Sequence, residues 1–96
     1  MVREKIIEYI TLHKGELERK FGVTKIGLFG SYARDDAPSD SDIDIVVELE
    51  KPDVFNLIGI KQTLEEEFGK KVDVVRLWDH MSRSLRARIE RDAIYV

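Results

Sequence analysis

The sequence predicts an α+β fold, in which helices pack against a mixed β-sheet. Three short runs rich in β-branched and apolar residues have the length and composition of strands, at 25–29, 43–49 and 71–77. Between them lie longer segments with apolar residues at helical spacing, at 3–21, 54–68 and 81–91. The chain has 96 residues, which is enough for one domain with one modest core over 1–96.

The first element is a helix over 3–21, followed by a strand over 25–29. Gly15 can divide the helix in two, and Gly22 is a typical C-terminal stop. The strand ends at Gly30, and residues 31–41 form a short helical turn and then a loop that contains Pro38. The apolar stripe of the helix comprises Ile6, Ile7, Ile10, Leu17 and Phe21.

The second strand, 43–49, leads into a helix for which Asp53 is the expected N-cap. Gly69 ends this helix, and the third strand follows over 71–77. The apolar face of the helix comprises Val54, Leu57, Ile60, Leu64 and Phe68.

The C-terminal helix is expected over 81–91, with a short strand over 93–96 after it. Its apolar positions, four residues apart, are Met81, Leu85 and Ile89. The same helix is basic, and we interpret its arginines as a solvated face balanced by Glu90 and Asp92. These arginines are Arg83, Arg86, Arg88 and Arg91.

Composition excludes several classes of function. The chain has no cysteine, so disulfides, thiolate metal sites and cysteine nucleophiles are absent. The formal net charge is −3, so direct binding of nucleic acid is not expected. No apolar run approaches the ~20 residues of a membrane span, and the N-terminus lacks an apolar signal core. We therefore expect a cytoplasmic protein.

Three aspartates are the candidate metal ligands. Asp42 and Asp44 alternate at the head of the second strand, so their side chains point to one side with Cα atoms ~7 Å apart. Asp73 interrupts the third strand, where an unpaired carboxylate is costly to bury. Together they suit two Mg²⁺ ions, which prefer carboxylate, water and phosphate oxygens. Asp40 continues the same alternation, but it lies nearer Pro38 in the loop, so Asp42 and Asp44 are preferred.

Gly30 and Ser31 form a candidate phosphate-binding turn. Unpaired backbone amides after a strand bind anions, glycine permits close approach, and the serine hydroxyl adds a donor. An ordinary serine cap at a strand-to-helix turn is the plainer interpretation of these two residues taken alone. Arg34 lies one helical turn past Ser31, where it can reach a phosphate or equally pair with Asp35 or Asp36. Metal-binding acids beside a phosphate turn indicate nucleotidyl transfer.

Two other motifs fail. A calcium loop of the EF-hand type that begins at Asp40 requires glycine at its sixth position and glutamate at its twelfth, where this chain has Ile45 and Lys51. A P-loop that begins at Gly22 requires Gly-Lys-Ser/Thr after four intervening residues, where the chain has Gly27-Leu28-Phe29.

The combined pattern resembles the minimal nucleotidyltransferases (MNT group) of the DNA polymerase β-like superfamily. It comprises Gly-Ser-Tyr-Ala-Arg at 30–34, Ser-Asp-Ile-Asp at 41–44 and the third acid Asp73, in an order that spans essentially the whole chain. Members of this group are antitoxins paired with HEPN-domain toxins. The resemblance implies the small nucleotidyltransferase fold, ATP as cosubstrate, Mg²⁺ as cofactor, and transfer of AMP to a tyrosine hydroxyl of the toxin.

By the same resemblance, Asp42 and Asp44 ligate metal, while Gly30 and Ser31 hold the triphosphate. Asp73 completes the site and accepts the proton of the attacking hydroxyl. The family usually has glycine where this chain has Asp35. Aspartate tolerates left-handed backbone angles, so the turn is expected to survive, but its charge opposes nucleotide binding.

Two alternatives stay open at this point. One is an antitoxin that binds and occludes its toxin without catalysis, which the charge of Asp35 favours. The other is nucleotidyl transfer to a small molecule or to an RNA end. A chain of this length leaves little room for an acceptor-binding domain, so we expect the acceptor to be a folded protein.

Overall fold

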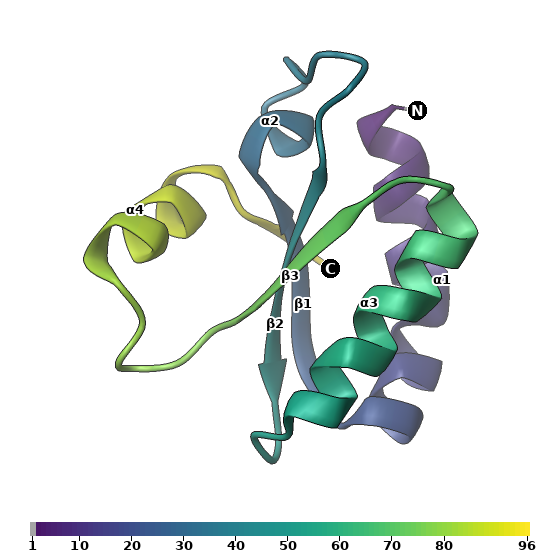
Figure 1. Ribbon diagram of the computed structural model, residues 1–96, viewed down its shortest axis with the longest axis vertical. Coiled ribbons are helices and arrows are strands. Elements are labelled where there is room, and N and C mark those ends of the chain that lie inside the picture. The colour runs from purple at the N-terminus through teal and green to yellow at the C-terminus, as the bar shows by residue number, and fades with distance from the viewer. Residues whose placement is uncertain (1) are drawn as a thin grey trace.

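The computed structural model describes residues 2–96 and confirms the predicted order of elements (Figure 1). These elements are α1 (Arg3–Phe21), β1 (Val23–Phe29), α2 (Gly30–Ala33), β2 (Ile43–Leu49), α3 (Val54–Phe68), β3 (Val72–Arg76), α4 (Arg83–Asp92) and β4 (Ile94–Tyr95). None of the helices within residues 2–96 is both long enough and apolar enough to cross a lipid bilayer.

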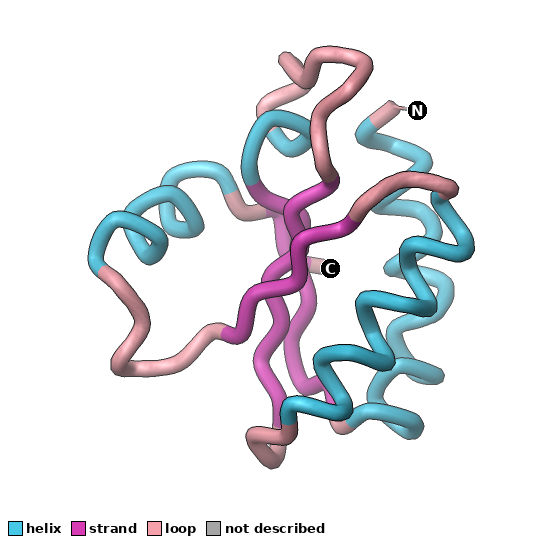
Figure 2. The backbone as a smooth tube through the Cα atoms, in the orientation of Figure 1, coloured by secondary structure: helices cyan, strands magenta, loops and turns pink. Residues whose placement is uncertain are grey.

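The four strands form one mixed sheet in the order β3-β2-β1-β4, which confirms the α+β class. Strand β2 runs antiparallel to β1 and parallel to β3, and β4 pairs antiparallel with β1 at the edge. The parallel connection from β2 to β3 is made by α3 (Figure 2). This arrangement brings the starts of β2 and β3 together at one end of the sheet, beside the end of β1.

The two faces of the sheet are covered by different helices (Figures 1 and 2). Alternate residues such as Ile43, Ile45 and Val72 join the core that the sheet forms with α1 and α3. The opposite face carries a smaller cluster around Phe29, Val46 and Ile89, to which α4 contributes. Because side chains alternate along a strand, Asp44 projects on the α4 side with Val46.

Several predicted helix ends are confirmed. Gly22 (φ 73°) and Gly69 (φ 62°) end α1 and α3 in the left-handed conformation that favours glycine. The Asp53 side chain accepts a hydrogen bond of 2.8 Å from the amide of Phe55, as an N-cap does.

Two expectations about the helices were wrong. Helix α1 is continuous through Gly15, because burial of Ile10 and Leu17 on either side outweighs the ~1 kcal/mol that one glycine costs a helix. In α3, Ile60, Leu64 and Phe68 are buried as expected, but Val54 is 61% exposed. The first turn of α3 lies at the end of the molecule where β2 stops, and Val54 therefore does not reach the core (Figure 1).

Candidate active site

The acids predicted from the sequence lie at one end of the sheet, on the face that α4 covers. Asp44 pairs in register with Asp73 on parallel β3 and with Phe29 on antiparallel β1, so the three form a row across the sheet. Neighbouring strands lie about 4.8 Å apart, and the two carboxylates are therefore adjacent. Asp42 lies one residue before β2, near enough for its charge to act on Asp44.

Asp44 is the most buried of the three acids, with its side chain 17% exposed. Burial raises the pKa of Asp44, and the charges of Asp73 and Asp42 raise it further. The positive charges of Arg88 and Arg34 lower that pKa without reversing the shift. The ionised carboxylate is therefore held in unfavourable surroundings, and a bound cation would stabilise it.

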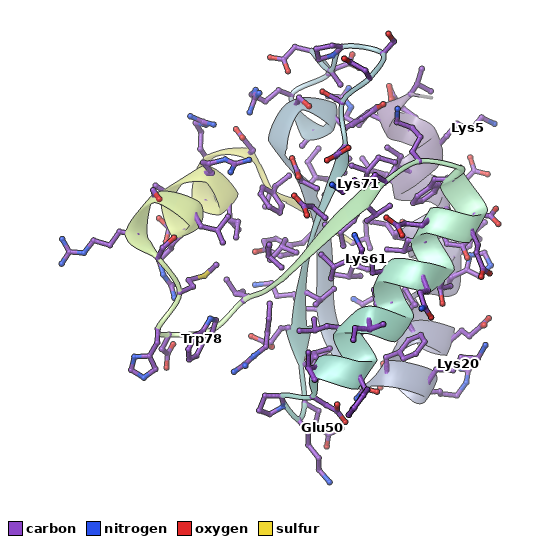
Figure 3. The ribbon with its side chains drawn as sticks, in the orientation of Figure 1. Lys5, Lys20, Glu50, Lys61, Lys71 and Trp78 are labelled. Atoms are coloured by element: carbon purple, nitrogen blue, oxygen red, sulfur yellow. The ribbon has the colours of Figure 1, made fainter. Side chains whose placement is uncertain are left out.

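Asp42 and Asp73 are more accessible. The Asp42 side chain is 43% exposed, and its Oδ2 lies 4.0 Å from Nζ of Lys71, at the head of β3 (Figure 3). Asp73 is exposed, so the cost of burial that singled it out in the sequence does not arise in the structure. Asp40 lies in the preceding turn and is exposed. It is not among the acids whose charge raises the pKa of Asp44, which are Asp73 and Asp42.

Gly30 fits closely against Asp44. Its φ is 74°, and a Cβ on this residue would lie 3.0 Å from Cγ of Asp44 and still nearer its Oδ2. Any side chain at position 30 would therefore clash with the carboxylate as well as strain the backbone. Glycine is required here because the turn that begins α2 lies directly against the acid.

The turn is tied to the acid-bearing segment through serines. Oγ of Ser31 lies 3.4 Å from Oγ of Ser41, the residue before Asp42. No side chain caps the N-terminus of α2, so its first amides lack the intrahelical and side-chain partners that would otherwise satisfy them. The structure therefore brings the predicted phosphate turn and the predicted metal ligands together.

The end of α2 shows how the chain accommodates Asp35 in the turn after the Gly-Ser motif. Asp35 has φ 63°, the left-handed conformation that the family's glycine would adopt with less strain. Its amide donates to the carbonyl of Tyr32 at 3.2 Å, and the amide of Asp36 donates to that of Ser31 at 3.0 Å. This paired closure is the Schellman motif, so the turn survives with aspartate at this position.

Arg34 makes ion pairs in the structure. Its Nε donates to Oδ2 of Asp36 at 3.2 Å, one of the pairings left open by the sequence, and its Nη1 donates to Oδ2 of Asp92 at 2.7 Å. The Asp92 side chain is 2% exposed, and Arg91 also pairs with it, so the pKa of Asp92 is lowered. These contacts join the end of α2 to the end of α4. A role for Arg34 in phosphate binding stays a prediction.

Sequence reasoning missed the part played by α4. Arg88, assigned to a solvated face, places Nη2 3.8 Å from Oδ2 of Asp44. Arg91 is 63% exposed and pairs with Asp92, as expected of a solvated and charge-balanced face, but the Asp92 side chain is buried. The basic residues of α4 were visible in the sequence, but no local pattern indicated that one of them would lie over the acids.

The acids fit a hard divalent cation by their chemistry, since they are three neighbouring carboxylates of which one is partly desolvated. In residues 2–96, however, no three acid, histidine or cysteine side chains converge as a ready ligand set. A separate cavity of about 460 Å³ is lined by residues of α1 and α3 that include Lys5, Tyr9, His13 and Phe68. It lies across the sheet from the acids.

Comparison with known proteins gives consistent matches over nearly the whole chain. Residues 10–96 match the family described as nucleotidyltransferase domain. The chain is 38% identical over 94 residues to the protein adenylyltransferase MntA of Thermococcus cleftensis, covering 97% of this chain and 94% of that protein.

Solved structures give the same result. One described as a minimal nucleotidyltransferase has a TM-score of 0.78 and 29% identity, covering 98% of this chain and 95% of that one. Another is a tri-AMPylated HEPN toxin of Shewanella oneidensis in complex with MNT antitoxin. Its matching chain has a TM-score of 0.62 and 26% identity, covering 97% of this chain and 66% of that one.

Proposed function

The chain belongs to the nucleotidyltransferase domain family, and we propose that it transfers AMP from ATP to a tyrosine hydroxyl of a partner HEPN toxin, acting as an antitoxin. The observation that carries this proposal is the contact of the Gly30 turn with Asp44, beside Asp73. In this proposal, the turn at Gly30 binds the phosphates and the acid that it contacts binds a cation. The relatives support the acceptor, since they include a protein adenylyltransferase and a solved complex of an AMPylated HEPN toxin with MNT antitoxin.

We assign Asp42, Asp44 and Asp73 as the residues that would hold Mg²⁺. When bound, two Mg²⁺ ions would neutralise these carboxylates and orient the nucleotide phosphates. Gly30 and Ser31 present the uncapped amides of α2 and one hydroxyl to the phosphates. Binding of a nucleotide is thus coupled to neutralisation of Asp44, whose pKa is raised in the free protein.

The transfer itself requires one proton acceptor. The tyrosine oxygen forms a bond to the α-phosphorus of ATP, and the bond from that phosphorus to the bridging oxygen of the β-phosphate breaks. Pyrophosphate leaves with that oxygen and its electron pair. Asp73 accepts the hydroxyl proton, a role that suits it because it is exposed and adjacent to Asp44. An exposed base can meet an acceptor that arrives on another protein.

The test is to incubate the protein with ATP, Mg²⁺ and the HEPN protein encoded beside it, and then to measure the mass of the toxin. We expect added AMP with the wild type. The double variant Asp42→Asn/Asp44→Asn should bind the toxin and leave it unmodified. Asp40→Asn is the matched control, because it removes the next acid of the same alternation and should keep activity. An unmodified toxin in a stable wild-type complex would overturn the proposal.

Occlusion of the toxin without catalysis is the second candidate. Two observations favour it: the negative charge of Asp35 beside the phosphate turn, and the guanidinium of Arg88 near Asp44. Under this alternative, Asp42→Asn/Asp44→Asn protects cells from the toxin as well as the wild type does. Loss of protection with intact binding supports AMP transfer. Labelled-nucleotide incorporation into RNA or a small molecule without a protein partner would support a different acceptor.

A further inference from the structure

Arg88 lies over the row of residues that carries the acids. Its Nη2 is 3.8 Å from Oδ2 of Asp44, and its guanidinium carbon is 5.6 Å from the ring centroid of Phe29. Phe29, Asp44 and Asp73 are register partners on three adjacent strands. The guanidinium therefore lies beside Asp44 and Phe29, on the face of the sheet from which Asp44 projects.

The contact between Arg88 and Asp44 is loose. A separation of 3.8 Å is longer than a hydrogen bond, and the Arg88 side chain is 50% exposed. The exposed guanidinium is open to solvent and salt, which weaken its attraction to Asp44, although that carboxylate is itself only 17% exposed. The guanidinium can therefore leave Asp44 at small cost once a bound cation neutralises the carboxylate.

The helix that carries Arg88 is held firmly. Ile89, the next residue, is 2% exposed and packs with Phe29 and Val46. Asp92 ties the end of α4 to Arg34 at the end of α2. The backbone at position 88 is thus fixed beside the acids, while the long side chain can move.

We propose that Arg88 is a nucleotide-positioning residue, which neutralises Asp44 in the free protein and binds a phosphate group of ATP once a divalent cation occupies that carboxylate. This inference rests on the proposed function and deepens it. Arginine suits both roles, because its planar fork pairs with carboxylates and with phosphates. The two roles have opposite effects on the two ligands, since in the first Arg88 competes with the metal and in the second it supports the nucleotide.

The test measures two affinities of Arg88→Gln without toxin and at fixed ionic strength. For Mn²⁺ alone, a probe of the metal site, we expect binding to tighten several-fold. For AMP-PNP with saturating Mg²⁺, we expect binding to weaken about tenfold, the effect of losing one charge-assisted hydrogen bond. Arg88→Lys keeps the charge and should leave the Mn²⁺ affinity near that of the wild type while restoring only part of the AMP-PNP affinity.

Arg83→Gln is the matched control, because it removes the same charge from the exposed start of the same helix. It should change neither affinity by more than the small effect of net charge. Equal weakening of both ligands, no change in either, or the same changes in Arg83→Gln would overturn the inference. If Arg88→Gln shifts the Mn²⁺ and AMP-PNP affinities in opposite directions but the wild type transfers no AMP to the toxin, the proposed function alone is refuted. If the wild type transfers AMP but Arg88→Gln shows no such opposite shifts, the role of Arg88 alone is refuted.

Discussion

Replacement of Asp35 by glycine tests whether the turn of the motif is strained. Asp35 has φ 63°, and its amide and that of Asp36 close the end of α2. An ordinary residue in the left-handed region costs roughly 1–2 kcal/mol, with aspartate toward the lower end. Glycine removes this strain but loses about 0.5–1 kcal/mol more chain entropy on folding. Asp35→Gly should therefore stabilise the protein slightly, by at most about 0.5 kcal/mol.

Thermal unfolding is the suitable assay. A domain of this size shifts its melting temperature by roughly 4–8 °C per kcal/mol, so we expect an increase of at most about 4 °C. Asp35→Ala is the decisive comparison, because alanine removes the charge, keeps the strain and lacks the local tolerance of aspartate. It should melt below the wild type. If Asp35→Ala melts at or above Asp35→Gly, the argument from backbone strain is refuted.

The same position also separates charge from conformation. Asparagine tolerates the left-handed conformation as aspartate does, so Asp35→Asn should keep the stability of the wild type and remove only the charge. We expect both Asp35→Asn and Asp35→Gly to bind AMP-PNP a few-fold more tightly at low salt, and this gain to shrink as salt screens the phosphates. An unchanged affinity in both variants would show that Asp35 does not oppose the nucleotide.

Two further predictions concern charges around the site. Asp44→Asn should lose activity but melt above the metal-free wild type at neutral pH. The folded-state pKa of Asp44 is raised, chiefly by burial, so the wild type loses stability as the pH rises from about 4 through that pKa. The variant has no carboxylate at this position and does not lose that stability. The difference should vanish near pH 3, and a variant that melts lower at pH 7 would contradict this reasoning. Arg34→Gln and Asp92→Asn should each lower the midpoint of urea unfolding, with a double variant that loses clearly less than the sum. If the losses of stability in the two single variants add up in the double variant, the ion pair does not couple α2 to α4. If Arg34→Gln selectively loses affinity for AMP-PNP, Arg34 instead binds a phosphate.

The sequence was most informative where a pattern is local. Strand β2 begins and ends at the predicted residues because its β-branched run is short and clearly bounded, and the caps at Gly22, Asp53 and Gly69 each depend on one residue. The sequence also grouped Asp73 with Asp42 and Asp44, and the parallel pairing of β2 with β3 brings Asp73 beside Asp44, although that register was not predicted.

Long-range pairing was not predictable from the chain alone. Arg34 and Asp92 are 58 residues apart, and nothing in either neighbourhood favours that partner over the adjacent acids. The contact of Arg88 with Asp44 depends on how α4 docks, which the cluster of Phe29, Val46 and Ile89 determines. The apolar periodicity of α4 predicted a buried face, but it did not say which face of the sheet would receive it. The arginines of α4 are largely exposed, as the sequence indicated, but the contact of Arg88 with Asp44 was not foreseen.

The geometry around Asp44 shows that the fold gives up stability at this site. Its carboxylate lies between the backbone of Gly30, which tolerates no side chain there, and a second acid in register on β3. Burial and repulsion both disfavour the ionised form in the free protein, and a loose arginine relieves them only in part. A structural role would be better served by asparagine, which keeps the shape without the charge. Under the proposed function, a bound cation and nucleotide would relieve this conflict, which gives a physical reason for an acid at position 44 in place of a neutral residue.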